Sequence, residues 1–126
     1  MMVYQQDTGL MFLDGAILGE GYSGQPPYVN SHADEDRLDL GPIPCGLWSV
    51  GPAYEDGELG PLVMNLDAMP GTPTYDRIEF RIHGDSITNP GYASKGCIVM
   101  PESTRLAIIQ SKETLLSVRL SSDGPP

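Results

Sequence analysis

Glycine and proline interrupt this chain from one end to the other, with no regular period. They account for 15 and 12 of its 126 residues. Because glycine weakens regular elements and proline removes a backbone hydrogen-bond donor, such a chain turns often and has little room for long helices. Its length suits one compact domain, residues 1–126, and leaves no room for a second. The sequence therefore predicts a single, mostly β domain with long loops.

Short runs of β-forming residues, separated by turn residues, indicate where the strands lie. We expect strands over 3–6, 10–13, 16–21, 47–50, 62–66, 78–83, 97–100 and 114–120, and one short helix over 101–112. The stretch 24–41 has no hydrophobic period and predicts a long loop or flap, and 121–126 a flexible tail. We expect Trp48, Leu106 and Ile109 to face the core. Alternation over 78–83 places Ile78, Phe80 and Ile82 on the core side and His83 on the opposite face.

The charge balance argues against polyanionic partners. Seven basic and 17 acidic residues give a net charge of -10, which repels phosphate backbones and anionic lipid head groups. No stretch approaches the roughly 20 apolar residues of a membrane-spanning helix. The first residues carry no basic and apolar signal pattern, so we expect synthesis in the cytoplasm without a signal peptide. We expect no nucleic-acid partner and no membrane insertion, whereas a cationic substrate group or a basic protein would suit this charge.

A histidine and a cysteine bracket the most informative loop of the chain. His83 ends one expected strand, Cys97 begins the next, and small residues such as Gly91 and Gly96 lie between them. A thiol attacks carbonyls only as a thiolate, and it needs a base or converging N–H groups to form one near neutral pH. The pattern predicts a nucleophile, Cys97, its base, His83, and a loop whose backbone N–H groups bind an oxyanion.

Each of these residues also has a structural interpretation. A lone thiol such as Cys97 is most often a small buried residue, and Ser94 and Asp85 could serve only to cap the loop. Cys45 follows a proline-rich turn and is interpreted as a buried structural thiol; a disulfide with Cys97 would inactivate the nucleophile. His32 stands among four acidic residues, Asp34, Glu35, Asp36 and Asp39, without the spacing of a calcium-binding loop. We interpret that segment as a solvated acidic flap and expect no metal and no cofactor.

The motif His83-Gly84 followed by Ser94-x-Gly96-Cys97 resembles the active-site signature of the YkuD-type L,D-transpeptidases, which are cysteine enzymes of bacterial peptidoglycan. A longer set of matches spans roughly residues 20 to 101 and resembles the small L,D-transpeptidase effectors that type VI secretion delivers into rival bacteria. That set comprises Tyr22-Ser23-Gly24, Asn30, Gly41-Pro42-Ile43-Pro44, Phe80-Arg81-Ile82-His83-Gly84-Asp85 and Pro90-Gly91-x-Ala93-Ser94-x-Gly96-Cys97-Ile98.

The resemblance implies an L,D-transpeptidase-like β-sandwich and a thioester mechanism. Cys97 would attack the carbonyl of a tetrapeptide stem and expel a terminal D-amino acid, with His83 as general base and Ser94 holding the site. N–H groups around Gly96 and Cys97, with Gly84, would form the oxyanion loop. Water or an amine would then resolve the thioester, giving L,D-carboxypeptidase or L,D-transpeptidase activity. An antibacterial toxin of this kind would act in the periplasm of a target bacterium and have an immunity protein and a secretion component as partners.

One position departs from the wider family, which usually has an arginine two residues after the cysteine, where this chain has Val99. Substrate binding by that arginine therefore cannot be carried over. Candidate substrate-binding residues are Arg81, Asp85, Tyr92 and Tyr22, and Tyr28 could line the same groove. Two alternatives remain: a noncatalytic cell-wall or partner-binding β-domain, and a phage lysis protein of the same fold.

Overall fold

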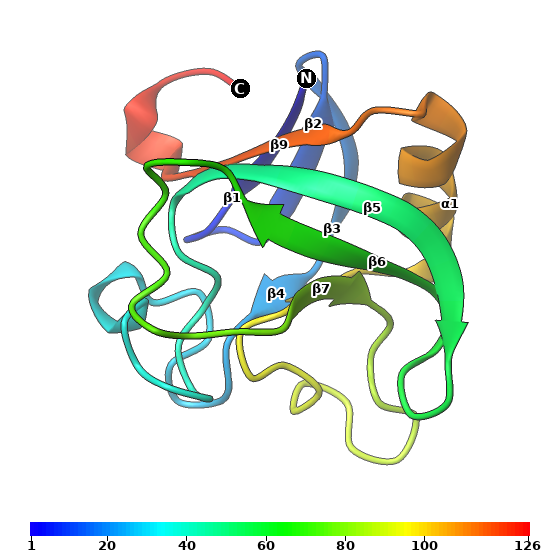
Figure 1. The fold of residues 1–126 in the computed structure, drawn as a ribbon, viewed down its shortest axis with the longest axis horizontal. Coiled ribbons are helices and arrows are strands. Elements are labelled where there is room, and N and C mark those ends of the chain that lie inside the picture. The colour runs from blue at the N-terminus through cyan, green and yellow to red at the C-terminus, as the bar shows by residue number, and fades with distance from the viewer.

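A computed structural model describes residues 1–126 as one strongly curved sheet of nine strands and one α-helix (Figure 1). The helix, α1, covers Glu102–Ser111, and short 3-10 turns cover His32–Asp34 and Ser121–Asp123. The strands run in the sheet order β3-β2-β1-β9-β5-β6-β7-β8-β4. Their bounds are β1 Met2–Gln5, β2 Leu10–Leu13, β3 Ala16–Glu20, β4 Tyr22–Ser23, β5 Gly46–Asp56, β6 Gly60–Ala68, β7 Phe80–His83, β8 Ile98–Val99 and β9 Leu115–Arg119.

The sheet is nearly closed, because its two edge strands are neighbours in the chain. β3 and β4 stand at opposite ends of the sheet order, and only Gly21 separates them. The Gly21 N–H donates to the carbonyl of Gly9 at 2.8 Å, and a Cβ at Gly21 would lie 1.8 Å from the carbonyl oxygen of Val99 in β8. Only glycine permits this close backbone approach.

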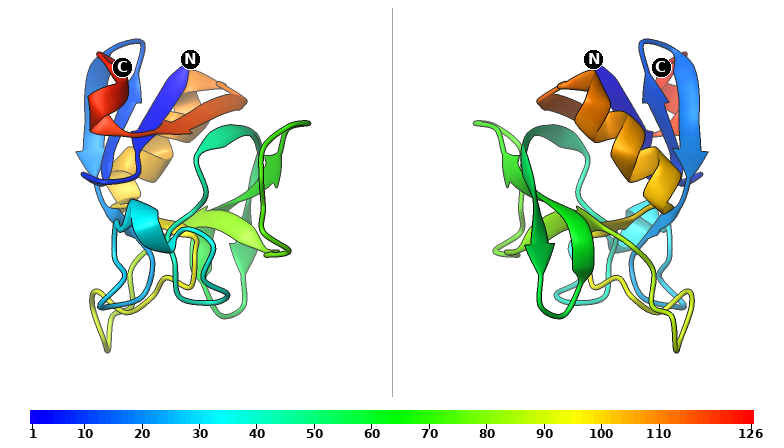
Figure 2. Two further views of the ribbon diagram at one scale, coloured as in Figure 1. Left: turned by 90° about the vertical axis from the view of Figure 1, so that its left-hand side faces the viewer. Right: turned by 90° about the vertical axis from the view of Figure 1, so that its right-hand side faces the viewer.

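The core fills the inside of the curved sheet. Trp48 and Phe80 pack edge to face with ring centroids 4.9 Å apart, within a cluster of 15 buried apolar residues. The cluster draws on β1, β2, β5–β9, α1 and two residues between elements, Ile43 and Met100. Figure 2 shows α1 lying between the N-terminal strands and the β5–β6 hairpin, and it contacts β3 and β6. α1 falls short of the length and hydrophobicity that a membrane-spanning helix needs.

The mostly β prediction with one helix after Cys97 is confirmed, and the differences are local. Ile108 is buried and Ile109 packs partly on the core, but Leu106 is exposed. Two residues turn an α-helix by about 200°, so Leu106 lies opposite Ile108. β5 and β6 are longer than expected because their pairing continues past Gly51 and Pro52 through an irregularity between Val50 and Ala53. A bulge of this kind is one of the few places in a sheet that can accommodate proline. Trp48 is buried as expected.

The two segments expected to be irregular are partly ordered by side-chain contacts. Residues 121–126 begin with a 3-10 turn whose Ser121 backbone N–H donates to Asp7 at 2.9 Å. Within 24–41, the buried Glu35 contradicts the expectation of a uniformly solvated acidic flap. The flap and the loop over 84–97 lie together at one end of the molecule in Figures 1 and 2. This end carries the candidate site.

Candidate active site

The expected nucleophile and base lie on neighbouring parallel strands. Ile82 pairs with Ile98, and His83 with Val99, which brings the end of β7 beside the start of β8. His83 and Cys97 line one pocket of about 250 Å³ at this point. The remaining lining residues include Arg81, Glu79, Tyr92, Lys95 and Gly96. The topology therefore brings together two residues that the loop 84–96 separates in sequence.

His83 is held as a neutral imidazole with one nitrogen free. Its Nδ1 lies 2.8 Å from the carbonyl oxygen of Gly84, which can only accept a hydrogen bond, so Nδ1 carries the proton and Nε2 does not. Burial lowers the pKa of His83, the bond to Gly84 opposes this shift, and the charges of Arg105 and Arg81 lower the pKa further. An unprotonated Nε2 is what a general base requires.

The burial of His83 differs from its expected position away from the core, since the residue is only 1% exposed. Arg105 of α1 lies close behind the adjoining Gly84, where a Cβ would be 2.7 Å from its guanidinium. The end of β7 is therefore covered on the side that alternation predicts to be open. Ile78, expected in the core, is 80% exposed because β7 begins only at Phe80.

Cys97 is partly buried, and its sulfur contacts the backbone just before β7. Its Sγ donates to the carbonyl of Glu79 at 3.5 Å, and no hydrogen bond joins it to His83. Burial raises the pKa of Cys97, while a backbone N–H of Arg81 and the charges of Arg81 and Arg77 oppose that shift. The resting site thus holds a protonated thiol beside a neutral imidazole, so attack on a carbonyl requires the base to remove the proton. Cys97 and Cys45 are both free, and no disulfide joins them.

Ser94 is completely buried and organises the loop rather than facing the pocket. Its Oγ donates to the carbonyl of Cys97 at 2.6 Å and accepts the N–H groups of Gly24 at 2.9 Å and Gly96 at 3.1 Å. The Gly96 N–H, a candidate oxyanion donor, is therefore already engaged. Gly96 has φ +133°, and a Cβ there would lie 2.4 Å from the Arg77 guanidinium, so the position requires glycine.

The four candidate substrate-binding residues fall into two groups. Arg81 and the half-exposed Tyr92 line the pocket of Cys97. Tyr22 and Asp85 line a different cavity, where the Tyr22 hydroxyl donates to Asp85 at 2.6 Å and accepts the Ala93 N–H at 3.0 Å. Burial and Asp85 raise the pKa of Tyr22 to about 12. These two residues hold the loop in shape. Tyr28, outside both cavities, stacks against Arg37.

Two buried arginines support the site and were not predicted from the sequence. Arg77 is 5% exposed and donates to the carbonyls of Glu35, Gly41, Pro42 and Lys95, which joins the flap to the loop before Cys97. Arg105 donates to the carbonyls of Met100 at 3.1 Å and Pro61 at 2.7 Å. Arginine is rarely buried, and nothing in the sequence distinguishes these two from the exposed ones.

Comparisons of this chain with protein-family models, with curated proteins and with solved structures found no match. The chemical capability of the site therefore follows from its geometry. A thiol, an imidazole with a free nitrogen, and a cationic side chain at Arg81 share one open pocket. Such an arrangement can perform nucleophilic attack on an amide carbonyl.

Proposed function

We propose that this chain is a cysteine enzyme that cleaves or exchanges the terminal D-amino acid of peptidoglycan tetrapeptide stems. The observation that carries the proposal is the shared pocket of His83, with its Nε2 unprotonated, and Cys97 on adjacent parallel strands. The signature His83-Gly84 with Ser94-x-Gly96-Cys97 supplies the substrate class through its resemblance to L,D-transpeptidases. In this proposal the curved sheet is a variant of the L,D-transpeptidase-like β-sandwich.

The reaction proceeds in two acyl transfers. His83 Nε2 accepts the thiol proton as Cys97 Sγ bonds to the stem carbonyl carbon, and the amide C–N bond then breaks. The leaving amine takes the proton from His83, and a thioester remains on Cys97. Water, or the amine of another D-amino acid or stem, attacks the thioester, loses its proton through His83 and releases the thiol. Hydrolysis of the thioester is the L,D-carboxypeptidase activity, and aminolysis is the L,D-transpeptidase activity.

Substrate binding must break the contact of the Cys97 thiol with Glu79 and bring the thiol to His83. In the resting site the thiol proton is directed at the Glu79 carbonyl, and its transfer requires Sγ to approach His83 Nε2. Arg81 lies in the same pocket, where its charge suits the carboxylate of the terminal D-amino acid. This arrangement gives Arg81 the role that Val99 cannot fill. The biological setting that fits is a delivered antibacterial toxin acting in the periplasm, with an immunity protein as its partner.

The test is incubation of the protein with a disaccharide tetrapeptide, followed by mass analysis of the products. We expect loss of terminal D-Ala, or its exchange when another D-amino acid is added. Cys97→Ala and His83→Gln should each lower the rate by at least about a hundredfold, as removal of a nucleophile or its base does. Ser49→Ala, on β5 and outside the pocket, is the matched control.

Wild-type protein that is folded but leaves the tetrapeptide intact and exchanges nothing would overturn the proposal. Product formation that survives Cys97→Ala would overturn it equally, because no other thiol lies in the pocket.

A second candidate function is noncatalytic binding of cell-wall peptides in the same pocket. It is favoured by the contact of Cys97 with the Glu79 carbonyl and by the burial that raises the pKa of the thiol. This alternative predicts muropeptide binding that is unchanged in Cys97→Ser and is accompanied by no turnover. Isothermal titration calorimetry of muropeptide binding, run alongside the product assay, separates the two functions.

A further inference from the structure

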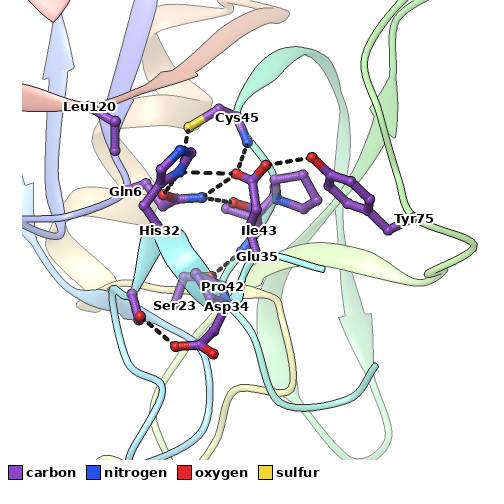
Figure 3. Close-up of polar contacts among 12 residues, drawn as sticks. Gln6, Ser23, His32, Asp34, Glu35, Pro42, Ile43, Cys45, Tyr75 and Leu120 are labelled. Carbon is purple, nitrogen blue, oxygen red and sulfur yellow. Dashed lines mark hydrogen bonds and ion pairs between the residues drawn. The ribbon is translucent and has the colours of Figure 1, made fainter. Parts of the chain in front are cut away.

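A second group of reactive side chains lies outside the pocket of Cys97, where the flap meets β1 and β5. His32 Nδ1, a carboxylate oxygen of Glu35 and Cys45 Sγ all lie within 4.8 Å of one another. His32 Nδ1 is 3.3 Å from Glu35 Oε1 and 3.9 Å from Cys45 Sγ (Figure 3). An imidazole, a carboxylate and a thiol converge here on one point.

The carboxylate of this group is held in position by neighbouring donors. Glu35 Oε1 accepts from the Gln6 side-chain amide at 2.9 Å and from the Cys45 N–H at 3.1 Å, and Oε2 accepts from the Tyr75 hydroxyl at 2.8 Å (Figure 3). Glu35 is buried, whereas the His32 side chain is 49% exposed. The group is therefore preorganised on the protein side and open to solvent on the other.

The spacing of the three donor atoms is close to that of a tetrahedral transition-metal centre. Zinc bonds of about 2.0–2.1 Å to nitrogen and oxygen and about 2.3 Å to sulfur place neighbouring ligand atoms roughly 3.3–3.6 Å apart. The His32–Glu35 separation of 3.3 Å already fits, the His32–Cys45 separation of 3.9 Å must shorten slightly, and the Glu35 oxygen and the Cys45 sulfur, which lie within 4.8 Å, must also come into this range. Gln6 Oε1, at 2.8 Å from His32 Nδ1, or a water can occupy the fourth position.

We propose that His32, Glu35 and Cys45 bind a divalent transition metal ion, with Zn²⁺ as the ion best suited to this donor set. Thiolate and imidazole ligands select such ions, whereas Ca²⁺ and Mg²⁺ require oxygen ligands. On binding, the Cys45 thiol releases its proton to solvent and its sulfur bonds to the metal. The His32 proton moves from Nδ1 to Nε2, which frees Nδ1 to coordinate.

The metal would brace the flap against the rest of the domain. His32 and Glu35 belong to the flap, while Cys45 immediately precedes β5. The backbone carbonyl of Glu35 is one of the four carbonyls bound by Arg77, which also reaches Lys95 of the active-site loop. A bound ion would thus stabilise the flap and, through Arg77, the loop that carries Cys97. The metal-site proposal does not rest on the proposed peptidoglycan chemistry.

The test is a titration of Co²⁺ into the reduced chain of residues 1–126 after removal of metal with a chelator. We expect one Co²⁺ per chain, visible absorption bands of tetrahedral Co²⁺ and a thiolate-to-cobalt charge-transfer band, all lost when Zn²⁺ is added. Cys45→Ser should remove the charge-transfer band, and Cys97→Ala, which deletes the other thiol, should retain it.

His32→Gln provides a second variant whose fold should survive, because that side chain is half-exposed. It should weaken the apparent affinity for Co²⁺ at least tenfold, and circular dichroism checks its fold. Absence of the charge-transfer band in the wild type at excess Co²⁺, or its persistence in Cys45→Ser, would overturn the proposal. The muropeptide assay reads the other site, so either proposal can fail without the other.

Discussion

Among single residues, His83 combines a buried position with an unprotonated nitrogen. It is buried where β7 meets the loop that follows, Arg105 lies behind the adjoining Gly84, and its Nδ1 is fixed by the Gly84 carbonyl. Burial, with the positive charges of Arg105 and Arg81, disfavours the imidazolium form. The protonation of the proposed base is thereby coupled to folding.

The pH dependence of stability should report this coupling. The folded-state pKa of His83 is lowered from 6.5, so the unfolded chain binds the proton more readily. The contribution of His83 to stability is therefore present above pH 6.5 and is lost as pH falls below that value. We expect the free energy of unfolding of the wild type to fall from pH 7 to pH 5 more steeply than that of His83→Gln.

Urea unfolding at several pH values, with chelator present, measures this difference. Ser49→Ala is the control, because it lies outside the pocket and removes no titratable group, so it should keep the wild-type slope. Equal slopes for the wild type and His83→Gln would contradict the expectation.

Ser94 shows how far the sequence could identify a residue's role. The motif marks Ser94 as part of the site and the loop composition suggests a cap, and the structure gives its hydroxyl three backbone partners. The partner Gly24 is 70 positions away in the chain, so no local pattern could indicate that bond. Tyr22 and Asp85 are similar, since their hydrogen bond also joins distant segments.

At the scale of elements, Arg77 connects the two irregular segments that frame the site. Its guanidinium donates to two carbonyls of the flap, to the carbonyl of Pro42 just after it, and to the carbonyl of Lys95 in the loop before Cys97. No salt bridge neutralises it, and its planar fork of donors satisfies the carbonyls instead. Lysine has neither the fork nor the number of donors.

Arg77→Lys should therefore destabilise the protein by roughly 2–3 kcal/mol, since buried carbonyls lose their partners. Amide hydrogen exchange should become faster in 35–42 and 94–97 before it does so in the strands. Arg119→Lys is the matched control, because the hydrogen bond of Arg119 runs from its Nε to the Ser117 hydroxyl and binds no backbone carbonyl. Unchanged exchange in both segments of Arg77→Lys would refute this role.

The strands were largely predictable because short runs of β-forming residues are separated by turn residues. β1, β2, β3, β7 and β9 lie close to their expected ranges. β4 was not predicted, because a two-residue strand has no periodicity and exists only through its pairing with β8. The extensions of β5 and β6 were missed because Gly51-Pro52 and Gly60-Pro61 are typical strand breakers. Pairing across the sheet overrides such local signals.

At the scale of the whole molecule, the near-closure of the sheet depends on the space around Gly21. The Val99 carbonyl occupies the position that any side chain there would need. Gly21→Ala should push the β3–β4 junction away from β8 and destabilise the fold by roughly 3 kcal/mol, the upper range for overpacking.

Gly57→Ala is the control for this substitution, because no atom lies within 4 Å of a Cβ built there and its φ is not in the left-handed region. It should change stability by no more than about 0.5 kcal/mol. Urea unfolding of both variants measures the difference, and similar midpoints would show that the junction tolerates a side chain.

The position of β9 sets the order in which this domain can be completed during synthesis. β9 lies between β1 and β5, and pairs with β1 in parallel and with β5 in antiparallel fashion. Until the ribosome has released residues 115–119, the β1–β3 unit has no hydrogen-bonded neighbour on its inner side. The nascent chain therefore holds two parts of a sheet that are linked through Gly21 on one side, and β9 joins them on the other.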